Sequence, residues 1–182
     1  MDITRRSLLA AAALPGVVAG SARDQSKALQ AAIIAAEAQG ADVFLPAGKY
    51  HASGLLITKP LRFAGVPGAT HILGNGEILV VQAARNVTLS GLSFTAAAGA
   101  VPATSKALVS AVEAENLTIR DCRFTGESPA GGLALHGCSG RVSGNQVSYF
   151  ETTGILALDS TGLEISGNTV SDIGNNGIQI WR

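Results

Sequence analysis

Charged and aromatic residues are scarce in this chain of 182 residues: 14% of them are Asp, Glu, Lys or Arg, and 4% are Phe, Trp or Tyr. The 13 basic and 13 acidic residues balance, so the formal net charge is zero and the basic surface typical of nucleic-acid-binding proteins is not expected. Two cysteines cannot build a disulfide scaffold or a four-ligand zinc site of cysteines. The composition therefore excludes nucleic acid as a partner and implies no metal ion and no cofactor.

Glycine and small apolar residues are abundant instead. The chain has 22 glycines, and 47% of its residues are hydrophobic. A core of Ala, Val, Ile and Leu interrupted by frequent glycines is typical of many short strands separated by tight turns. The stretch Gly74-Asn75-Gly76 precedes such an apolar run, and no Lys-Ser or Lys-Thr pair follows a glycine-rich loop. A dinucleotide-binding fingerprint and a phosphate-binding loop are therefore not supported.

Residues 1–22 have the three parts of an export signal: a charged start, an apolar run and a small-residue end. Arg5 and Arg6 directly precede the apolar run, as in a twin-arginine signal, which the Tat export machinery would recognise. A Sec signal can also contain two arginines, so the route stays open. The run from Leu8 to Ala22 is shorter than the ~20 residues that a bilayer requires, so no stable membrane span is expected. We predict an exported bacterial protein, periplasmic or extracellular.

Residues 23–85 predict a capping helix followed by the first coils of a β-structure. Asp24 can cap the start of the helix and Gly40 can end it. The apolar residues between them recur at helical spacing, at Leu29, Ala32, Ile33 and Ala36. Short apolar runs bounded by Gly and Pro follow at 43–45, 55–57, 61–63 and 78–81, and these runs are typical of strands.

Residues 86–182 contain a repeat of about 23 residues. Two apolar columns recur with the same spacings of 30, 23 and 23 residues: Leu89, Ile119, Val142 and Ile165; and Phe94, Phe124, Val147 and Val170. The longer first interval is explained by a loop inserted at 96–105. A second set of strands starts at Gly132, Gly154 and Gly177. Several short strands per unit, without a helix, predict a parallel β-helix in which each coil stacks on the next.

A third column with the same spacing contains Leu92, Cys122, Asn145 and Asn168. Asparagines one coil apart can form a ladder of amide hydrogen bonds inside such a cylinder, so we predict a structural role for them. Cys122 then points inward, whereas Cys138 is expected at a turn. A disulfide between them after export stays open but is disfavoured by this geometry.

With these features the chain resembles the pectate-lyase-like superfamily of right-handed β-helices. The signal, the helix, the stretch Leu45-Pro46-Ala47-Gly48-Lys49-Tyr50 and the Asn-containing repeats resemble a group of Tat-translocated repeat proteins of uncharacterised function. The resemblance covers essentially the whole chain. It implies an all-β fold, a right-handed single-stranded parallel β-helix (solenoid) with an N-terminal capping helix, and it implies no particular activity.

Candidate functional residues lie on the outward columns of the second strand set. One column contains Ser110, Ala134, Leu156 and Gln179; the next contains Val112, His136, Leu158 and Trp181; and the strand ends contain Glu113, Gly137, Asp159 and Arg182. His136, Asp159, Arg182 and Glu113 are the catalytic candidates, and Trp181 could stack on a sugar ring. A glycosidase requires two carboxylates about 5 to 10 Å apart, which Glu113 and Asp159 would meet only by chance.

Structural roles compete with catalysis at each of these positions. Arg182 could be the surface ion-pair partner of Asp159, and an exposed or hydrogen-bonded histidine explains His136 equally well. The aspartate clusters of pectate lyases are missing, because Asp121, Asp159 and Asp172 fall in different columns. The chain also stops at Trp181-Arg182, within a predicted strand, so we expect further C-terminal coils in a longer protein.

Two classes of function follow. The first is an exported β-helix protein without catalytic activity that binds polysaccharide or serves as an envelope scaffold. The second is a carbohydrate-active lyase, hydrolase or epimerase whose active face lies largely in the missing coils. Few charged residues and no evident catalytic constellation favour the first class, and whether the protein is an enzyme stays undecided at this point.

Overall fold

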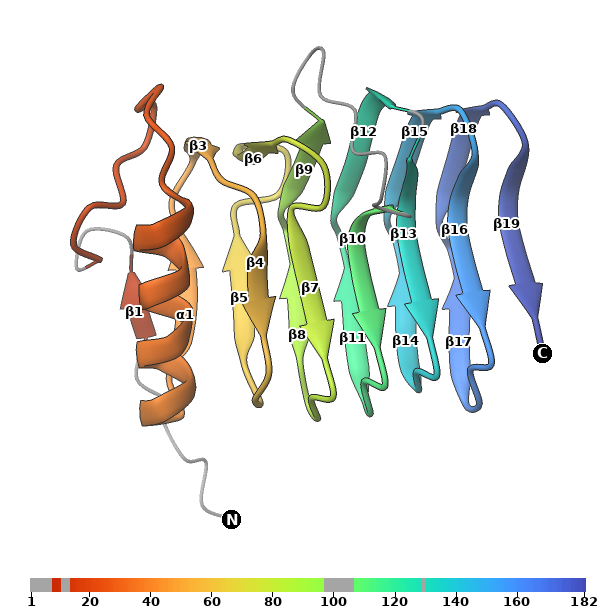
Figure 1. The fold of residues 1–182 in the computed structure, drawn as a ribbon, viewed down its shortest axis with the longest axis horizontal. Coiled ribbons are helices and arrows are strands. Elements are labelled where there is room, and N and C mark those ends of the chain that lie inside the picture. The colour runs from red at the N-terminus through yellow and green to blue at the C-terminus, as the bar shows by residue number, and fades with distance from the viewer. Residues whose placement is uncertain (1–7, 11–13, 97–106, 129) are drawn as a thin grey trace.

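The computed structural model describes residues 8–10, 14–96, 107–128 and 130–182, and its strand pairs are parallel and form three sheets (Figure 1). Sheet 1 has the order β1 (Leu8–Ala10), β2 (Asp42–Leu45), β5 (Arg62–Gly65), β8 (Thr88–Ser90), β11 (Leu117–Arg120), β14 (Gly140–Ser143) and β17 (Leu163–Ser166). Sheet 2 has the order β3 (Gly48–His51), β6 (Thr70–Gly74), β9 (Ser93–Ala96), β12 (Arg123–Ser128), β15 (Gln146–Phe150) and β18 (Thr169–Ile173). Sheet 3 has the order β4 (Leu55–Ile57), β7 (Leu79–Gln82), β10 (Ala107–Val112), β13 (Gly131–His136), β16 (Thr153–Leu158) and β19 (Asn176–Trp181).

Each consecutive group of three strands, from β2–β3–β4 to β17–β18–β19, contributes one strand to each sheet and so forms one coil. The coils stack side by side along the long axis of the molecule (Figure 1). This architecture is a right-handed parallel β-helix, as the sequence predicted. Coil stacking buries the inward side chains of all three sheets in one continuous aliphatic core.

The strand registers confirm the predicted columns. Ile119 pairs with Leu89 on one side and with Val142 on the other, and Val142 pairs with Ile165. The second column is continuous in the same way, from Phe94 through Phe124 and Val147 to Val170. Similar side chains stack because each inward position meets its counterpart one coil away.

The predicted helix is α1 (Ser26–Gln39), which packs on β2 and β4 at the N-terminal end of the cylinder. It buries the four predicted residues, Leu29, Ala32, Ile33 and Ala36. Gly40 ends the helix in a left-handed conformation, φ +62°. The N-cap position is Gln25 rather than Asp24, and Gln25 makes no side-chain cap bond. Asp24 acts one residue earlier: its Oδ1 accepts hydrogen bonds from the hydroxyl and the backbone N–H of Ser26, which lower the pKa of Asp24.

Two strands, β3 and β6, do not correspond to any apolar run in the sequence. In β3 the buried Tyr50 lies between Lys49 and His51, and in β6 the buried Ile72 lies between His71 and the half-buried Leu73. Thr70 is fully buried in β6 because its hydroxyl hydrogen-bonds to the carbonyl oxygens of Leu45 and Pro46. A buried threonine carries no hydrophobic signal, and only two apolar side chains, Ile72 and Leu73, follow it, so the sequence pattern missed this strand.

Part of the segment predicted as an export signal takes part in the fold. Strand β1 pairs with β2 at the edge of sheet 1, and Leu14 and Val17 are buried against the core. The side chain of Gln25 holds this segment by bonding to the backbone N–H and carbonyl oxygen of Val18. Arg5 and Arg6 lie outside the described residues, so the signal and its twin-arginine route stay predictions.

Three further predictions concern a membrane span, the inserted loop and the C-terminal coils. In the described part of the chain, no helix has both the length and the apolar character needed to cross a membrane. The loop predicted at 96–105 falls, beyond Ala96, outside the described residues. At the C-terminal end, β17, β18 and β19 are edge strands, and Ile178 and Ile180 are exposed. The expected continuation of the coils stays a prediction.

Candidate functional site

The outer face of sheet 3 contains the candidate residues, in the register that the sequence predicted. Ser110 pairs with Ala134, Ala134 with Leu156, and Leu156 with Gln179. The neighbouring column runs from Val112 through His136 and Leu158 to Trp181. Parallel strands about 4.8 Å apart therefore display equivalent side chains in rows along the helix axis.

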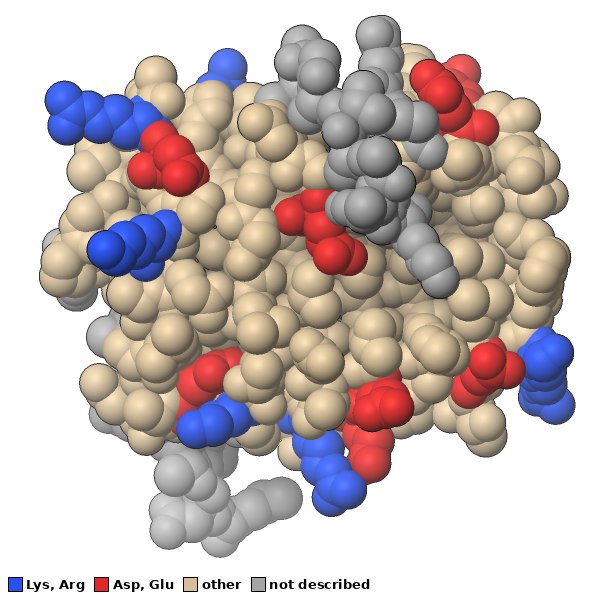
Figure 2. All heavy atoms as spheres, in the orientation of Figure 1, with Lys and Arg blue, Asp and Glu red and all other residues tan. Residues whose placement is uncertain are grey.

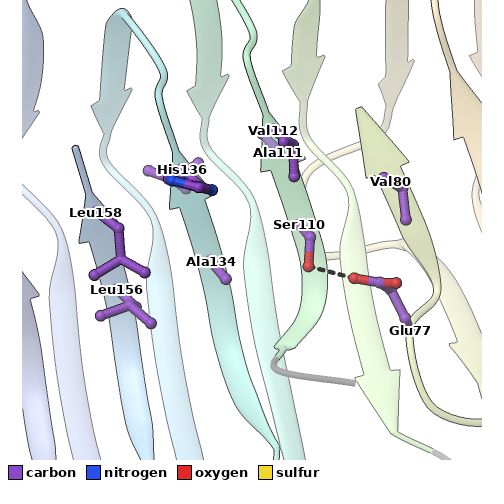
Figure 3. A pocket seen from close by; sticks show the side chains of 10 residues that line it. Glu77, Val80, Ser110, Ala111, Val112, Ala134, His136, Leu156 and Leu158 are labelled. Atoms are coloured by element: carbon purple, nitrogen blue, oxygen red, sulfur yellow. Dashed lines mark hydrogen bonds between the residues drawn. The ribbon is translucent and has the colours of Figure 1, made fainter. Parts of the chain in front are cut away.

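A groove of about 300 Å³ crosses this face. Its floor and walls are mainly aliphatic, and three polar side chains project into it. The lining residues are Glu77, Val80, Ser110, Ala111, Val112, Ala134, Leu135, His136, Leu156 and Leu158. In Figure 3, Glu77 and Ser110 lie on one side, and His136 with Leu156 and Leu158 lies on the other. A shallow apolar trough with polar groups at both ends has the general character of a small-ligand site.

Glu77 and Ser110 form one polar end of the groove. The Ser110 hydroxyl donates a hydrogen bond to Oε1 of Glu77, across one coil step from β10 to the start of β7 (Figure 3). Ser110 is nearly buried, whereas Glu77 is half-buried, so the carboxylate keeps oxygen lone pairs for a further donor. The sequence analysis interpreted Gly74-Asn75-Gly76 as a turn and did not consider the glutamate that follows it.

His136 and Asp159 form the other polar end. Nε2 of His136 lies 3.3 Å from Oδ2 of Asp159, and both side chains are more than half exposed. Asp159 adopts a left-handed conformation, φ +47°, directly after β16, and its carboxylate reaches back one coil to the histidine. When Nε2–H donates to the carboxylate, Nδ1 of the neutral ring carries the lone pair. Nδ1 of His136 could then accept a proton from a ligand or orient one of its hydroxyl groups.

The two polar ends are close enough for one ligand to contact both. Ser110 pairs with Ala134, and His136 follows two residues later on the same strand. One coil step and two residues along a strand separate the positions by roughly 8 Å. A single sugar unit or two adjacent ones could therefore bridge Ser110 and His136, and the carboxylate of Glu77 is hydrogen-bonded to Ser110 at that end.

The other sequence candidates lie away from the groove lining. Arg182 was a possible ion-pair partner of Asp159, but the carboxylate of Asp159 bonds to His136 instead. Glu113 lies at the end of β10, where its backbone N–H bonds to the carbonyl oxygen of His136, and its side chain is not part of the lining. Trp181 continues the His136 column on the edge strand β19 and is 62% exposed. The structure thus groups His136 with Asp159 and adds Glu77 and Ser110.

The asparagine column lies inside the cylinder, away from the groove. Oδ1 of Asn145 accepts the backbone N–H of Cys122, and Oδ1 of Asn168 accepts that of Asn145. The amide nitrogens donate to the carbonyl oxygens of Ile119 and Val142, and Nδ2 of Asn145 also donates to Oδ1 of Asn168. These bonds satisfy backbone groups at the turn between sheets 1 and 2.

Both cysteines are free and buried. Cys138 lies in the turn between β13 and β14, as predicted, but the residue is 1% exposed, and its sulfur contacts the carbonyl oxygen of Ala111 inside the cylinder. Burial raises the pKa of the Cys122 thiol to about 12 and also raises that of Cys138. In the described residues, no three His, Cys, Asp or Glu side chains gather in an arrangement that could hold a metal ion.

We expect both thiols to be inert in the native protein. The thiolate is the reactive form, and a raised pKa combined with burial leaves little thiolate accessible at about pH 8. A chromogenic disulfide reagent should therefore react slowly with the native protein and rapidly with two thiols after unfolding in urea. Rapid native labelling of either cysteine would contradict this packing.

The fold and the groove define a parallel β-helix protein with an open site on the outer face of one sheet. The chain belongs to the family described as right handed beta helix region, which matches residues 69–181. No curated protein matches the chain.

Solved structures with the same fold include ORF18 of Geobacillus virus E2, at 16% identity and a TM-score of 0.72, covering 94% of this chain and 40% of that one. The A-module of the mannuronan C-5 epimerase AlgE4 from Azotobacter vinelandii has 20% identity and a TM-score of 0.58, with coverage of 93% and 59%. PfbA, a surface adhesin of Streptococcus pneumoniae, has 14% identity and a TM-score of 0.50, with coverage of 89% and 61%. The chain thus spans less than two thirds of the length of these structures, and the likeness concerns the fold.

Proposed function

We propose that this protein binds a polysaccharide in the groove of sheet 3, as an exported binding or scaffold protein of the cell envelope. The observation that supports this most directly is the composition of the groove, an aliphatic floor with hydrogen-bonding groups at both ends. Sugar rings present apolar C–H faces and a hydroxyl rim, so they match such a surface. One sugar unit is also similar in length to a coil step, so successive units of a polymer could meet equivalent positions on successive coils.

The solved structures with the same fold are consistent with this proposal, but their likeness concerns the fold and is not its basis. One is named for mannuronan, a polysaccharide, and another for adhesion at a bacterial surface. Export would bring the chain to such polymers, and it rests on the N-terminal sequence around Arg5 and Arg6. The Tat machinery would then be a partner during export only.

Binding is tested by replacing an aliphatic residue of the groove floor. Leu156→Asn should weaken binding of the full chain to its polysaccharide about tenfold or more, a loss of about 1.4 kcal/mol, because it removes apolar contact from the floor. Leu56→Asn is the matched control: Leu56 lies on the same sheet, is partly exposed and is not part of the groove lining. Isothermal titration with soluble glycan fractions measures both variants. Equal affinities for the two variants would reject the groove as the binding site.

A second candidate, a carbohydrate-active enzyme, is favoured by one observation. Glu77 and the His136–Asp159 pair face the same groove, so a carboxylate and an imidazole could act as acid and base on one bound sugar. The same titration samples are assayed for new reducing ends and for unsaturated products. Product formed by the wild type and lost in His136→Gln would establish catalysis, whereas binding without product supports the binding protein.

A further inference from the structure

Among the described residues that line it, the groove contains negative charge that is not balanced by positive charge. None of the ten described residues that line it is Lys or Arg, and Glu77 is the carboxylate among them. The other polar end, His136, is paired with a second carboxylate, that of Asp159. A ligand in the groove therefore meets one carboxylate directly and another through the imidazole.

Two arginines outside the groove lining already have acidic partners. Arg85, in the turn after β7, forms an ion pair with Glu115 at 3.1 Å, and Arg141 on β14 forms one with Glu164 at 2.8 Å. Figure 2 shows the face of Figure 1 on which sheet 3 lies: the Lys and Arg side chains drawn in blue lie toward its margins, and an acidic group lies near its middle. Recruiting one of these arginines to a ligand would break an existing pair.

This distribution determines which glycans fit. Sugar carboxylates and sulfates are usually held by Arg or Lys through charge-assisted hydrogen bonds. In this groove an anionic sugar would meet Glu77 instead, with the carboxylate of Asp159 behind the imidazole of His136. Like charges at close range are repulsive in a partly desolvated site. Carboxylates do accept hydrogen bonds from sugar hydroxyls, and they attract an amino group.

We propose that the groove accepts glycans without negative charge, either neutral or amine-bearing, and rejects anionic ones. This inference rests on the proposed binding of a polysaccharide, and it adds the chemical class of the ligand. It assigns Glu77 as the residue that sets the charge preference, with its orientation fixed by the hydrogen bond from Ser110.

The experiment compares three oligosaccharides of equal length: a neutral cello-oligosaccharide, a chitosan oligomer carrying free amines, and an oligogalacturonate. Each is titrated into the full chain at low and at moderate salt. We expect the neutral or the amine-bearing oligomer to bind at least about tenfold more tightly than the oligogalacturonate. Added salt should reduce the discrimination against the anionic oligomer, because screening weakens the repulsion from the carboxylates.

Two substitutions test whether the charge of Glu77 in the groove causes the preference against the anionic oligomer. Glu77→Gln keeps a hydrogen-bond acceptor for Ser110 but removes the charge, so it should improve oligogalacturonate binding several-fold. Glu151→Gln removes a charge from an exposed turn outside the groove lining and should leave the ranking unchanged.

The possible outcomes separate the two proposals. Tight binding of the oligogalacturonate, or a Glu77→Gln variant with unchanged preference, would overturn the charge inference and leave glycan binding standing. Absence of binding to all three oligomers would overturn the proposed function and this inference with it.

Discussion

Asn145→Ala should destabilise the protein by about 3 kcal/mol. The amide of Asn145 is 1% exposed and accepts the backbone N–H of Cys122 while donating to the carbonyl oxygen of Ile119. Alanine removes both partners and leaves two buried backbone groups without hydrogen bonds, each at a cost of about 1–3 kcal/mol. The free energy of unfolding from urea titration, followed by circular dichroism, measures the loss.

Asn168→Ala is the matched control for this substitution. Asn168 makes the same kinds of bond one coil further along, but it is half-exposed, so water can replace the lost amide. We expect a smaller loss, about 1 kcal/mol. Equal effects of the two substitutions would mean that burial does not determine the contribution of the ladder. A loss below about 1 kcal/mol in Asn145→Ala would mean that the ladder is not an important source of stability.

The repeat was predictable from the sequence because the inside of the cylinder imposes strict requirements. An inward residue such as Ile119 contacts its counterparts one coil before and after, so the same residue types recur at one spacing. The outward columns followed from the same register without further information, which is why His136 and Leu158 were placed correctly relative to each other. The prediction was strongest where every coil has the same length.

The groove could not be predicted in the same way, because it depends on contacts outside the repeat. Glu77 bonds to Ser110 across 33 residues, a separation that includes the predicted inserted loop, so no regular spacing connects them. His136 and Asp159 lie in adjacent columns rather than in one, and they meet because the left-handed turn at Asp159 directs its carboxylate back by one coil. An alignment of equivalent positions in successive coils cannot detect contacts between non-equivalent positions, such as that of His136 with Asp159.

The first coils also show where local pattern fails. Strands β3 and β6 have few apolar residues, and they form because neighbouring coils supply hydrogen-bond partners to their backbone. Cys138 is a second case: it lies at a turn, as predicted, but the turn position alone did not predict that its side chain is buried inside the cylinder. In both cases the stacking of coils decides the outcome, and the sequence of one coil does not contain that information.

Phe124→Ala should cause the largest loss of stability, about 4 kcal/mol. The rings of Phe94 and Phe124 stack with centroids 5.5 Å apart and planes inclined by 12°, and both side chains are fully buried. Truncation removes the ring stack and leaves a cavity between Phe94 and Val147, which the neighbouring coils cannot fill because their strands fix their positions. Urea unfolding measures the change.

Phe124→Leu tests whether the loss comes from the cavity or from the ring stack. Leucine keeps most of the apolar volume but not the ring, so it should cost only about 1–1.5 kcal/mol, the contribution of an aromatic pair beyond its burial. Val147→Ala, one coil further along the same column, removes less volume and should fall between wild type and Phe124→Ala. If Phe124→Leu were as destabilising as Phe124→Ala, the stack itself would dominate over the filling of the core. We expect the opposite order, because filling the core volume contributes more than the ~0.5–1.5 kcal/mol of an aromatic pair, and the described residues contain one stacked pair of rings, Phe94 and Phe124.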